Sequence, residues 1–104
     1  ISKDYGCTVQ KVVVMKAYAS TIINESLEVR GFSKKVNKNL LEWHRDAENR
    51  NIFVESGSGW MLQLDNNLPV KLEEGKIYRI ERGVYHRLIK ENACSDLLLV
   101  IKKS

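Results

Sequence analysis

The chain has 104 residues, of which 43% are hydrophobic and 29% are charged. This length and composition are typical of one ordinary globular domain, with no room for a second core. No apolar run approaches the roughly 20 residues that span a bilayer, and the N-terminal ISKDYG lacks the basic and then apolar pattern of a signal peptide. We therefore expect a cytoplasmic protein without a membrane partner.

The distribution of charge argues against a nucleic-acid-binding protein, and the spacing of the cysteines argues against a cysteine metal site. The net charge is +4, but the lysines and arginines are spread along the chain and form no stripe interleaved with aromatic residues. This pattern favours a solvated basic surface, and no nucleic-acid partner is expected. Cys7 and Cys94 lie far apart and in no metal-binding spacing, so two free thiols are expected, with one disulfide as the alternative.

Short β-rich runs separated by turn signals make up the chain. Residues 11–16 form the first predicted strand, and residues 18–23 continue it, start another strand, or begin a short helix over 18–27. The further predicted strands cover residues 27–35, 40–44, 50–55, 60–65, 70–72, 77–80, 85–89 and 96–102. The last of them is apolar throughout and is expected to be buried on both faces. Turn signals every 8 to 12 residues or so predict an all-β sandwich or barrel of antiparallel strands.

Four residues with metal-binding side chains stand in a suggestive arrangement. In an extended segment, Glu42, His44 and Asp46 share one face, because residues two apart point the same way about 7 Å apart. His86, the only other histidine, would join them from another strand. Two imidazoles and a carboxylate suit Fe(II), Mn(II), Ni(II) or Zn(II), so we predict one divalent transition metal held by these four residues. Of the two carboxylates, Asp46 is the one expected to face solvent, and the alternative for the histidines is a hydrogen-bonded structural role.

The spacing around His86 resembles the second motif of the cupin superfamily. That motif reads Gly, five residues, Pro, one residue, Gly, two residues, His, three residues, Asn. Gly75, Gly83 and His86 match it without a gap, whereas Glu81 and Lys90 replace the proline and the asparagine. The two glycines are interpreted as turn residues without a chemical role.

The spacing around His44 resembles the first cupin motif, which reads Gly, five residues, His, one residue, His, three residues, Glu, six residues, Gly. His44 and Gly57 match, while Lys38, Asp46 and Arg50 occupy the positions of the first glycine, the second histidine and the glutamate. The resemblance covers residues 27–102. It implies an all-β double-stranded β-helix, the cupin jelly-roll barrel, in a single domain 1–104 whose N-terminal strands are residues 1–26.

The segment LLEWHRDAENR, residues 40–50, is similar to the cupin domain of type II phosphomannose isomerases. The corresponding strand there reads Leu-Ser-Leu-Gln, one residue, His, one residue, His-Arg, one residue, Glu. Glu42 stands in place of the glutamine, and the arginine and glutamate are exchanged as Glu48 and Arg50. This resemblance implies a pocket for a sugar, a sugar phosphate or a small carboxylate. Arg50 suits a bidentate grip on an anion, and alternatively pairs with Glu48 at the barrel rim and binds nothing.

These observations lead to three functional hypotheses. The first is binding of a sugar, sugar phosphate or other small anion, with isomerase or epimerase chemistry in which His44 or His86 is the general base. In it, Arg50, Glu48, Tyr78 and Tyr85 contact the substrate, with packing as the alternative for the tyrosines. The others are a metal-dependent dioxygenase and a non-catalytic ligand-sensing domain. Exposed edge strands and two tryptophans predict a homodimer.

Overall fold

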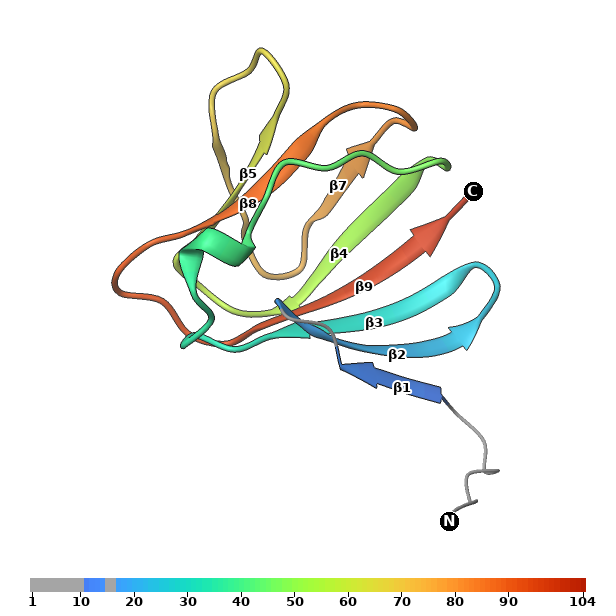
Figure 1. Ribbon diagram of the computed structural model, residues 1–104, viewed down its shortest axis with the longest axis horizontal. Coiled ribbons are helices and arrows are strands. Elements are labelled where there is room, and N and C mark those ends of the chain that lie inside the picture. Colours follow the sequence, from blue (N-terminus) through green and yellow to red (C-terminus); the bar gives the residue numbers. More distant parts are fainter. Residues whose placement is uncertain (1–10, 15–16) are drawn as a thin grey trace.

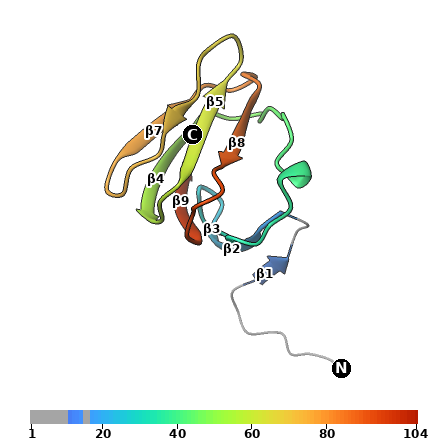
Figure 2. The same cartoon turned by 90° about the vertical axis from the view of Figure 1, so that its left-hand side faces the viewer.

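Two antiparallel β-sheets form the walls of a barrel in the computed structural model, which describes residues 11–14 and 17–104 (Figure 1). The large sheet has the strand order β1-β2-β3-β9-β4-β7, and the small sheet has the order β6-β5-β8. Figure 2 shows β5 and β8 of the small sheet lying across from the strands of the large one. The elements are β1 (Lys11–Val14), β2 (Ala19–Asn24), β3 (Leu27–Phe32), the 3-10 helix η2 (Lys38–Leu40), β4 (Arg50–Ser56), β5 (Trp60–Leu64), β6 (Val70–Lys71), β7 (Ile77–Ile80), β8 (His86–Lys90) and β9 (Leu97–Lys103). Among the described residues, no helix is long and apolar enough to cross a membrane.

The core lies between the two sheets and follows from strand alternation. In β9, the buried residues are Leu97, Leu99 and Ile101, and the side chains between them are half-buried. The prediction that this strand is buried on both faces is therefore wrong, because only every second side chain points inward. Trp60 of β5 is fully buried, and its indole Nε1 donates to the carbonyl of Ser95 at 2.8 Å.

Polar residues continue the inward faces of the same strands at one end of the barrel. In β4, Arg50 precedes the buried Ile52 on the same face, and in β9 Lys103 follows Ile101. Arg50 and Lys103 are direct partners in the β4–β9 ladder. One end of the interior is therefore apolar and the other is charged.

The segment between β3 and β4 differs from its prediction. The Asn37 side chain accepts a hydrogen bond from the Asn39 backbone N–H at 2.9 Å and starts the helix η2, so the predicted strand 40–44 does not form. Residues 41–49 then run beside β8, joined to it by an isolated bridge (Figure 1). The helical alternative for 18–27 is also wrong, since β2 turns directly into β3. Residues 15 and 16 of the predicted first strand lie outside the described residues.

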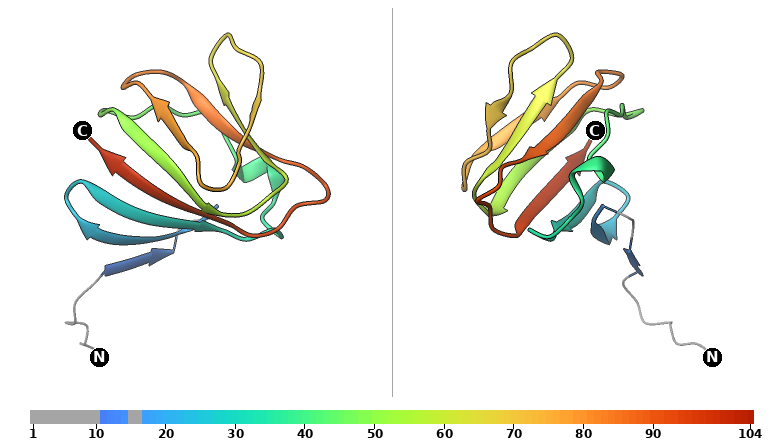
Figure 3. Two further views of the ribbon diagram at one scale, coloured as in Figure 1. Left: turned by 180° about the vertical axis from the view of Figure 1, so that it is seen from behind. Right: turned by 60° about the vertical axis from the view of Figure 1, so that its left-hand side comes forward.

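The predicted homodimer stays a prediction. Three of the exposed apolar side chains, Leu68, Val70 and Ile77, lie on or beside β6 and β7, which are edge strands of the two sheets. Figure 3 shows the hairpin between β5 and β6 projecting beyond the sheets. Cys94 is half-buried and forms no disulfide among the described residues, and Cys7 lies outside them.

Gly59 occupies a turn that no other residue fits. Its φ is +81°, and a Cβ there would lie 2.5 Å from the carbonyl oxygen of Ala93. Gly59→Ala should therefore lower the free energy of unfolding by about 3 kcal/mol, since a left-handed residue costs about 1–2 kcal/mol before any clash is counted. Gly75→Ala is the matched control, because Gly75 has φ +82° but no atom within 4 Å of its Cβ position. Urea unfolding of both variants measures the difference, and equal losses would contradict the close contact at Gly59.

Candidate metal centre

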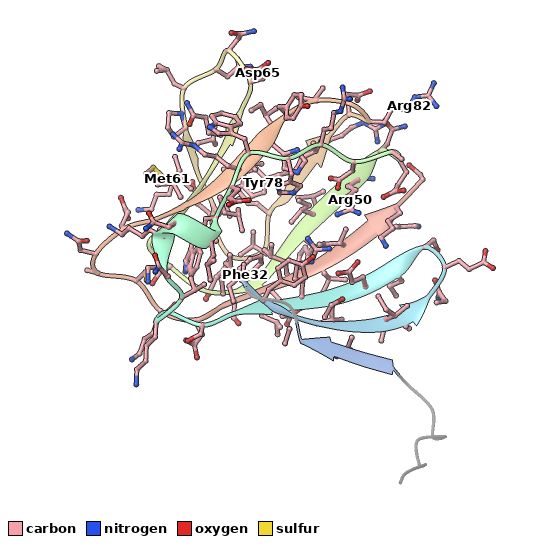
Figure 4. The ribbon with its side chains drawn as sticks, in the orientation of Figure 1. Phe32, Arg50, Met61, Asp65, Tyr78 and Arg82 are labelled. Atoms are coloured by element: carbon pink, nitrogen blue, oxygen red, sulfur yellow. The ribbon has the colours of Figure 1, made fainter. Side chains whose placement is uncertain are left out.

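A cavity of about 280 Å³ lies at the charged end of the barrel interior. His44 and His86 both line it, which confirms the prediction that the two histidines share one cavity. Figure 4 shows Arg50 within the barrel and Arg82 at the turn after β7, pointing away from it. The charged and polar lining residues are Arg30, Glu42, His44, Asp46, Arg50 and His86.

The backbone brings the two imidazoles into contact. His44 N–H donates to the His86 carbonyl at 3.0 Å, and His86 N–H donates to the His44 carbonyl at 2.8 Å. This reciprocal pair is the bridge that joins the segment 41–49 to β8. It places the ring centroids 4.2 Å apart with the rings inclined at 62°.

Backbone carbonyls set the tautomer of both rings. His44 Nδ1 lies 3.0 Å from the Glu42 carbonyl oxygen, and His86 Nδ1 lies 2.9 Å from that of Val84. A carbonyl oxygen only accepts, so each Nδ1 carries the proton and each neutral ring keeps an unprotonated Nε2. Histidines that ligate a metal commonly hold their second nitrogen in this way.

Asp46 contributes the carboxylate. Its side chain is 12% exposed, and its Oδ2 lies 3.3 Å from His86 Nε2. This short separation is not a hydrogen bond when the ring is neutral, because neither atom then carries a proton. Oδ2 is accordingly buried without a hydrogen-bond partner among the described residues, a condition that costs about 1–3 kcal/mol for a polar group.

The two predicted carboxylates have exchanged places. Asp46 was expected to face solvent and is instead turned inward, whereas Glu42 is exposed and uses its backbone carbonyl to hold His44. The reason is that 41–49 is not a regular strand, so the alternation that would place Glu42 beside His44 and Asp46 does not hold along it. The group able to hold a metal is therefore His44, Asp46 and His86, whose ligand atoms all lie within 4.8 Å of one another.

Electrostatics favour the unprotonated form of the cluster. Burial lowers the pKa of His86 below its ordinary value, and the neighbouring charges of His44 and Arg50 lower it further. The hydrogen bond to the Val84 carbonyl and the charge of Asp46 raise the pKa but do not outweigh these effects. The imidazole is therefore neutral at neutral pH, which is the form that binds metals. Three ligand atoms within 4.8 Å of one another, one of them buried and without a hydrogen-bond partner among the described residues, fit a divalent cation.

Arg50 is turned inward and held by carboxylates. Its Nε and Nη2 donate to Glu48 Oε1 at 3.2 and 2.9 Å, and Nη2 lies 3.4 Å from Asp46 Oδ1. The Arg50–Glu48 pair that the sequence allowed as an alternative therefore exists, but Arg50 is only 11% exposed and lines the cavity. Arg50 therefore holds Asp46 in place, and the Glu48 carboxylate is already paired with Arg50. The substrate contacts predicted for Arg50 and Glu48 stay predictions.

Neither predicted tyrosine lines this cavity. The Tyr78 hydroxyl donates to the Lys71 carbonyl at 3.1 Å and accepts from the Glu73 N–H at 2.9 Å, because the ring points towards the β6–β7 connection. Tyr85 is 43% exposed, with the guanidinium of Arg45 5.1 Å from its ring centroid. The substrate contacts predicted for the two tyrosines are therefore not supported in this cavity, and Tyr78 packs against the core as the alternative expected.

One charged group was missed in the sequence. Glu28 and Arg30 of β3 share the inward face with the buried Phe32, and Arg30 lines the cavity. The signal was present in LEVRGF, residues 27–32, where alternation places two charges on the face that carries a core phenylalanine. A charged pair in that position needs a structural or binding explanation.

Comparison with known proteins supports the fold. No protein-family model and no curated protein matches the chain. Among solved structures, it is similar to an Fe(II) form of the enzyme HppE (TM-score 0.71, 16% identity, 91% of this chain and 56% of that one). It is also similar to hydroxypropylphosphonic acid epoxidase from S. wedmorenis in complex with fosfomycin (0.71, 15%, 91% and 55%) and to a protein of unknown function from Vibrio parahaemolyticus (0.68, 10%, 91% and 98%).

Together with the sheet topology, these likenesses establish an all-β jelly-roll barrel of the cupin type. The chain spans 55 to 62% of the HppE and epoxidase chains that it matches. At identities of 16% and below, the likeness concerns the fold alone.

Proposed function

We propose that the protein is a metal-dependent cupin that holds one divalent transition metal, with Fe(II) favoured, through His44, Asp46 and His86. The observation that carries this proposal is the convergence of three ligand atoms within 4.8 Å of one another, with Asp46 Oδ2 buried and unpartnered among the described residues. Two imidazoles and one carboxylate form the ligand set associated with non-haem Fe(II) oxygenases.

The rest of the site supports an enzyme of the oxygenase type. An Fe(II) ion held by three protein ligands would keep open positions and supply redox chemistry with dioxygen. Arg50 acts as a positioning residue, because it fixes Asp46 and leaves Oδ2 directed at His86. The cavity wall beside the metal ligands is mostly apolar, as in many small-molecule sites. One of the similar structures is described as an Fe(II) form of HppE, which agrees with this choice of metal.

Metal titration tests the proposal with a matched pair of variants. Purified protein should bind one Fe(II) or Mn(II) per chain under anaerobic conditions, as measured by calorimetry and by metal analysis after gel filtration. Asp46→Asn should weaken binding by roughly 100-fold or more, since even outer-shell partners of a metal site are worth 10–100-fold. Glu42→Gln changes the carboxylate that lines the cavity outside the cluster and should leave affinity unchanged. Equal behaviour of the two variants would refute the proposed ligand set.

The finer sequence-based hypotheses stay predictions. They are a sugar or sugar-phosphate ligand, isomerase or epimerase chemistry with His44 or His86 as general base, kinship with phosphomannose isomerases, and non-catalytic ligand sensing. In a metal-loaded site, both imidazoles would be ligands through Nε2, which removes the atom that a general base uses. Isomerase chemistry is therefore an alternative to the metal site and not an addition to it.

A further inference from the structure

We propose that the cavity binds a small organic acid, with its carboxylate or phosphonate group on Arg30 and its carbon skeleton against the apolar wall. This inference rests on the proposed function, because it assigns the substrate class of the same cavity. Arg30, which would bind the anion, lies on β3 and lines the cavity outside the metal cluster.

Size and lining limit the ligand to a small, mostly apolar molecule. At about 30 Å³ for each water, a cavity of 280 Å³ holds roughly nine waters or a ligand of about that many non-hydrogen atoms. A sugar would leave most of its hydroxyl groups unpaired against an apolar wall, whereas a hydrocarbon skeleton gains from leaving water. The wall is formed by Phe32, Ile52, Leu62, Ile80, Leu88 and Leu99.

The charges around the cavity are divided into two groups of opposite sign. The group around Arg50 has two carboxylates for one guanidinium and therefore carries a net negative charge. The second group has two cations for one carboxylate, because Glu28 is shared by Arg30 at 2.7 Å and Lys103 at 3.2 Å. A metal cation is attracted to the first group and an anion to the second. Arg30, and not Arg50, is therefore the anion-binding residue.

Arg30 is already held in place for such a contact. Its Nε and Nη2 bind Glu28 Oε2 at 2.8 and 2.7 Å, and its guanidinium carbon lies 4.0 Å from the centroid of the Tyr18 ring. Glu28 is fixed in turn by the Ser20 hydroxyl at 2.6 Å. No hydrogen bond joins the Arg30 Nη1 to residues 11–14 or 17–104, and this atom is not one of the buried polar atoms left without a partner. A fixed guanidinium with unused donors binds an oxyanion with little loss of conformational entropy.

The test compares acids with a neutral amide of the same shape. Calorimetry or NMR titration should show binding of 4-methylpentanoate or of butylphosphonate, and the acid that binds more tightly identifies the preferred anionic group. The neutral 4-methylpentanamide should bind at least tenfold more weakly. Arg30→Met should weaken acid binding at least tenfold. Arg79→Met, which removes an exposed arginine paired with Glu81, should leave it unchanged. Arg30→Lys keeps a cation beside Glu28 and is the variant to test if Arg30→Met does not fold. It should also weaken acid binding, because lysine lacks the planar, two-pronged guanidinium that binds an oxyanion.

Equal affinities for the acid and the amide, or undiminished acid binding by a folded Arg30 variant, would overturn the inference. Titration of the same samples with Zn(II) separates the two proposals. Acid binding without metal binding would overturn the metal site and leave the Arg30 site standing. Metal binding without acid binding would overturn the Arg30 site alone.

Discussion

Replacement of Arg50 by glutamate should lower the free energy of unfolding of the metal-free protein by about 3 kcal/mol, the usual loss when one partner of a buried ion pair is removed. The new carboxylate would stand beside Asp46 and Glu48 without the cation that both now contact. The same change should raise the affinity for a divalent metal at least tenfold, because a positive charge near the ligands is replaced by a negative one. Added Mn(II) at 100 times its dissociation constant should then restore about 2.7 kcal/mol.

Two variants provide the controls for this result. Arg50→Met removes the guanidinium without adding a charge, so its gain in metal affinity should fall between wild type and Arg50→Glu. Arg79→Glu reverses an exposed arginine whose side chain is 48% accessible and should change stability by less than about 1 kcal/mol. Denaturant unfolding with and without Mn(II) measures all three. An Arg50→Glu protein as stable as wild type, with unchanged metal affinity, would show that Arg50 does not control this site.

Low pH should lower the free energy of unfolding through protonation of Glu28. Burial on its own raises the pKa of this carboxyl group, but the hydrogen bond from Ser20 and the charges of Arg30 and Lys103 outweigh it and lower the pKa from 4.5 to about 2. Since the pKa is lower in the folded state, the stabilisation is fully present above about pH 4.5 and is lost as the pH falls towards 2. The shift corresponds to about 3 kcal/mol near neutral pH.

Glu28→Gln should remove this contribution. Its free energy of unfolding should be about 3 kcal/mol below that of wild type at pH 6, and the difference should shrink towards zero near pH 2. Glu81→Gln is the matched control, because Glu81 is 63% exposed in its pair with Arg79 and should matter by less than about 1 kcal/mol at any pH. Thermal or urea unfolding between pH 2 and 7 gives the result. A difference for Glu28→Gln that does not vary with pH would argue against the charge network around it.

Much of the fold could be predicted because its local signals agree. Alternation in 50–55 and the turn glycines at 75 and 83 were sufficient to predict β4 and the strands around β7, since the local pattern and the turn positions agree there. The segment 40–44 had the same alternation, yet the side chain of Asn37 starts a 3-10 turn there. This capping hydrogen bond ends the extended pattern before residue 41, and the residues that carry the first histidine are then placed by the bridge between His44 and His86.

The candidate site was predicted in part. The spacing of His44 and His86 pointed to a shared cavity, because both lie in cupin-like register with their glycines. The choice between Glu42 and Asp46 could not be made from alternation, since it depends on an irregular backbone that is held by Gly83 N–H donating to the Asp46 carbonyl at 2.8 Å. Residues of a site that lie on a segment without a periodic structure are the ones that sequence periodicity places wrongly.

The attachment of the segment 41–49 to β8 means that the proposed metal would also hold two parts of the chain together. That segment supplies two of the three ligands but is joined to β8 by the isolated bridge at His44, while the third ligand lies on β8 itself. A bound ion would then be a reversible link between segments about 40 residues apart, and it would stabilise the folded chain because the unfolded chain does not hold it. The lifetime of the protein in the presence of proteases would follow the supply of metal, with cleavage beginning in 41–49 when the ion is withdrawn.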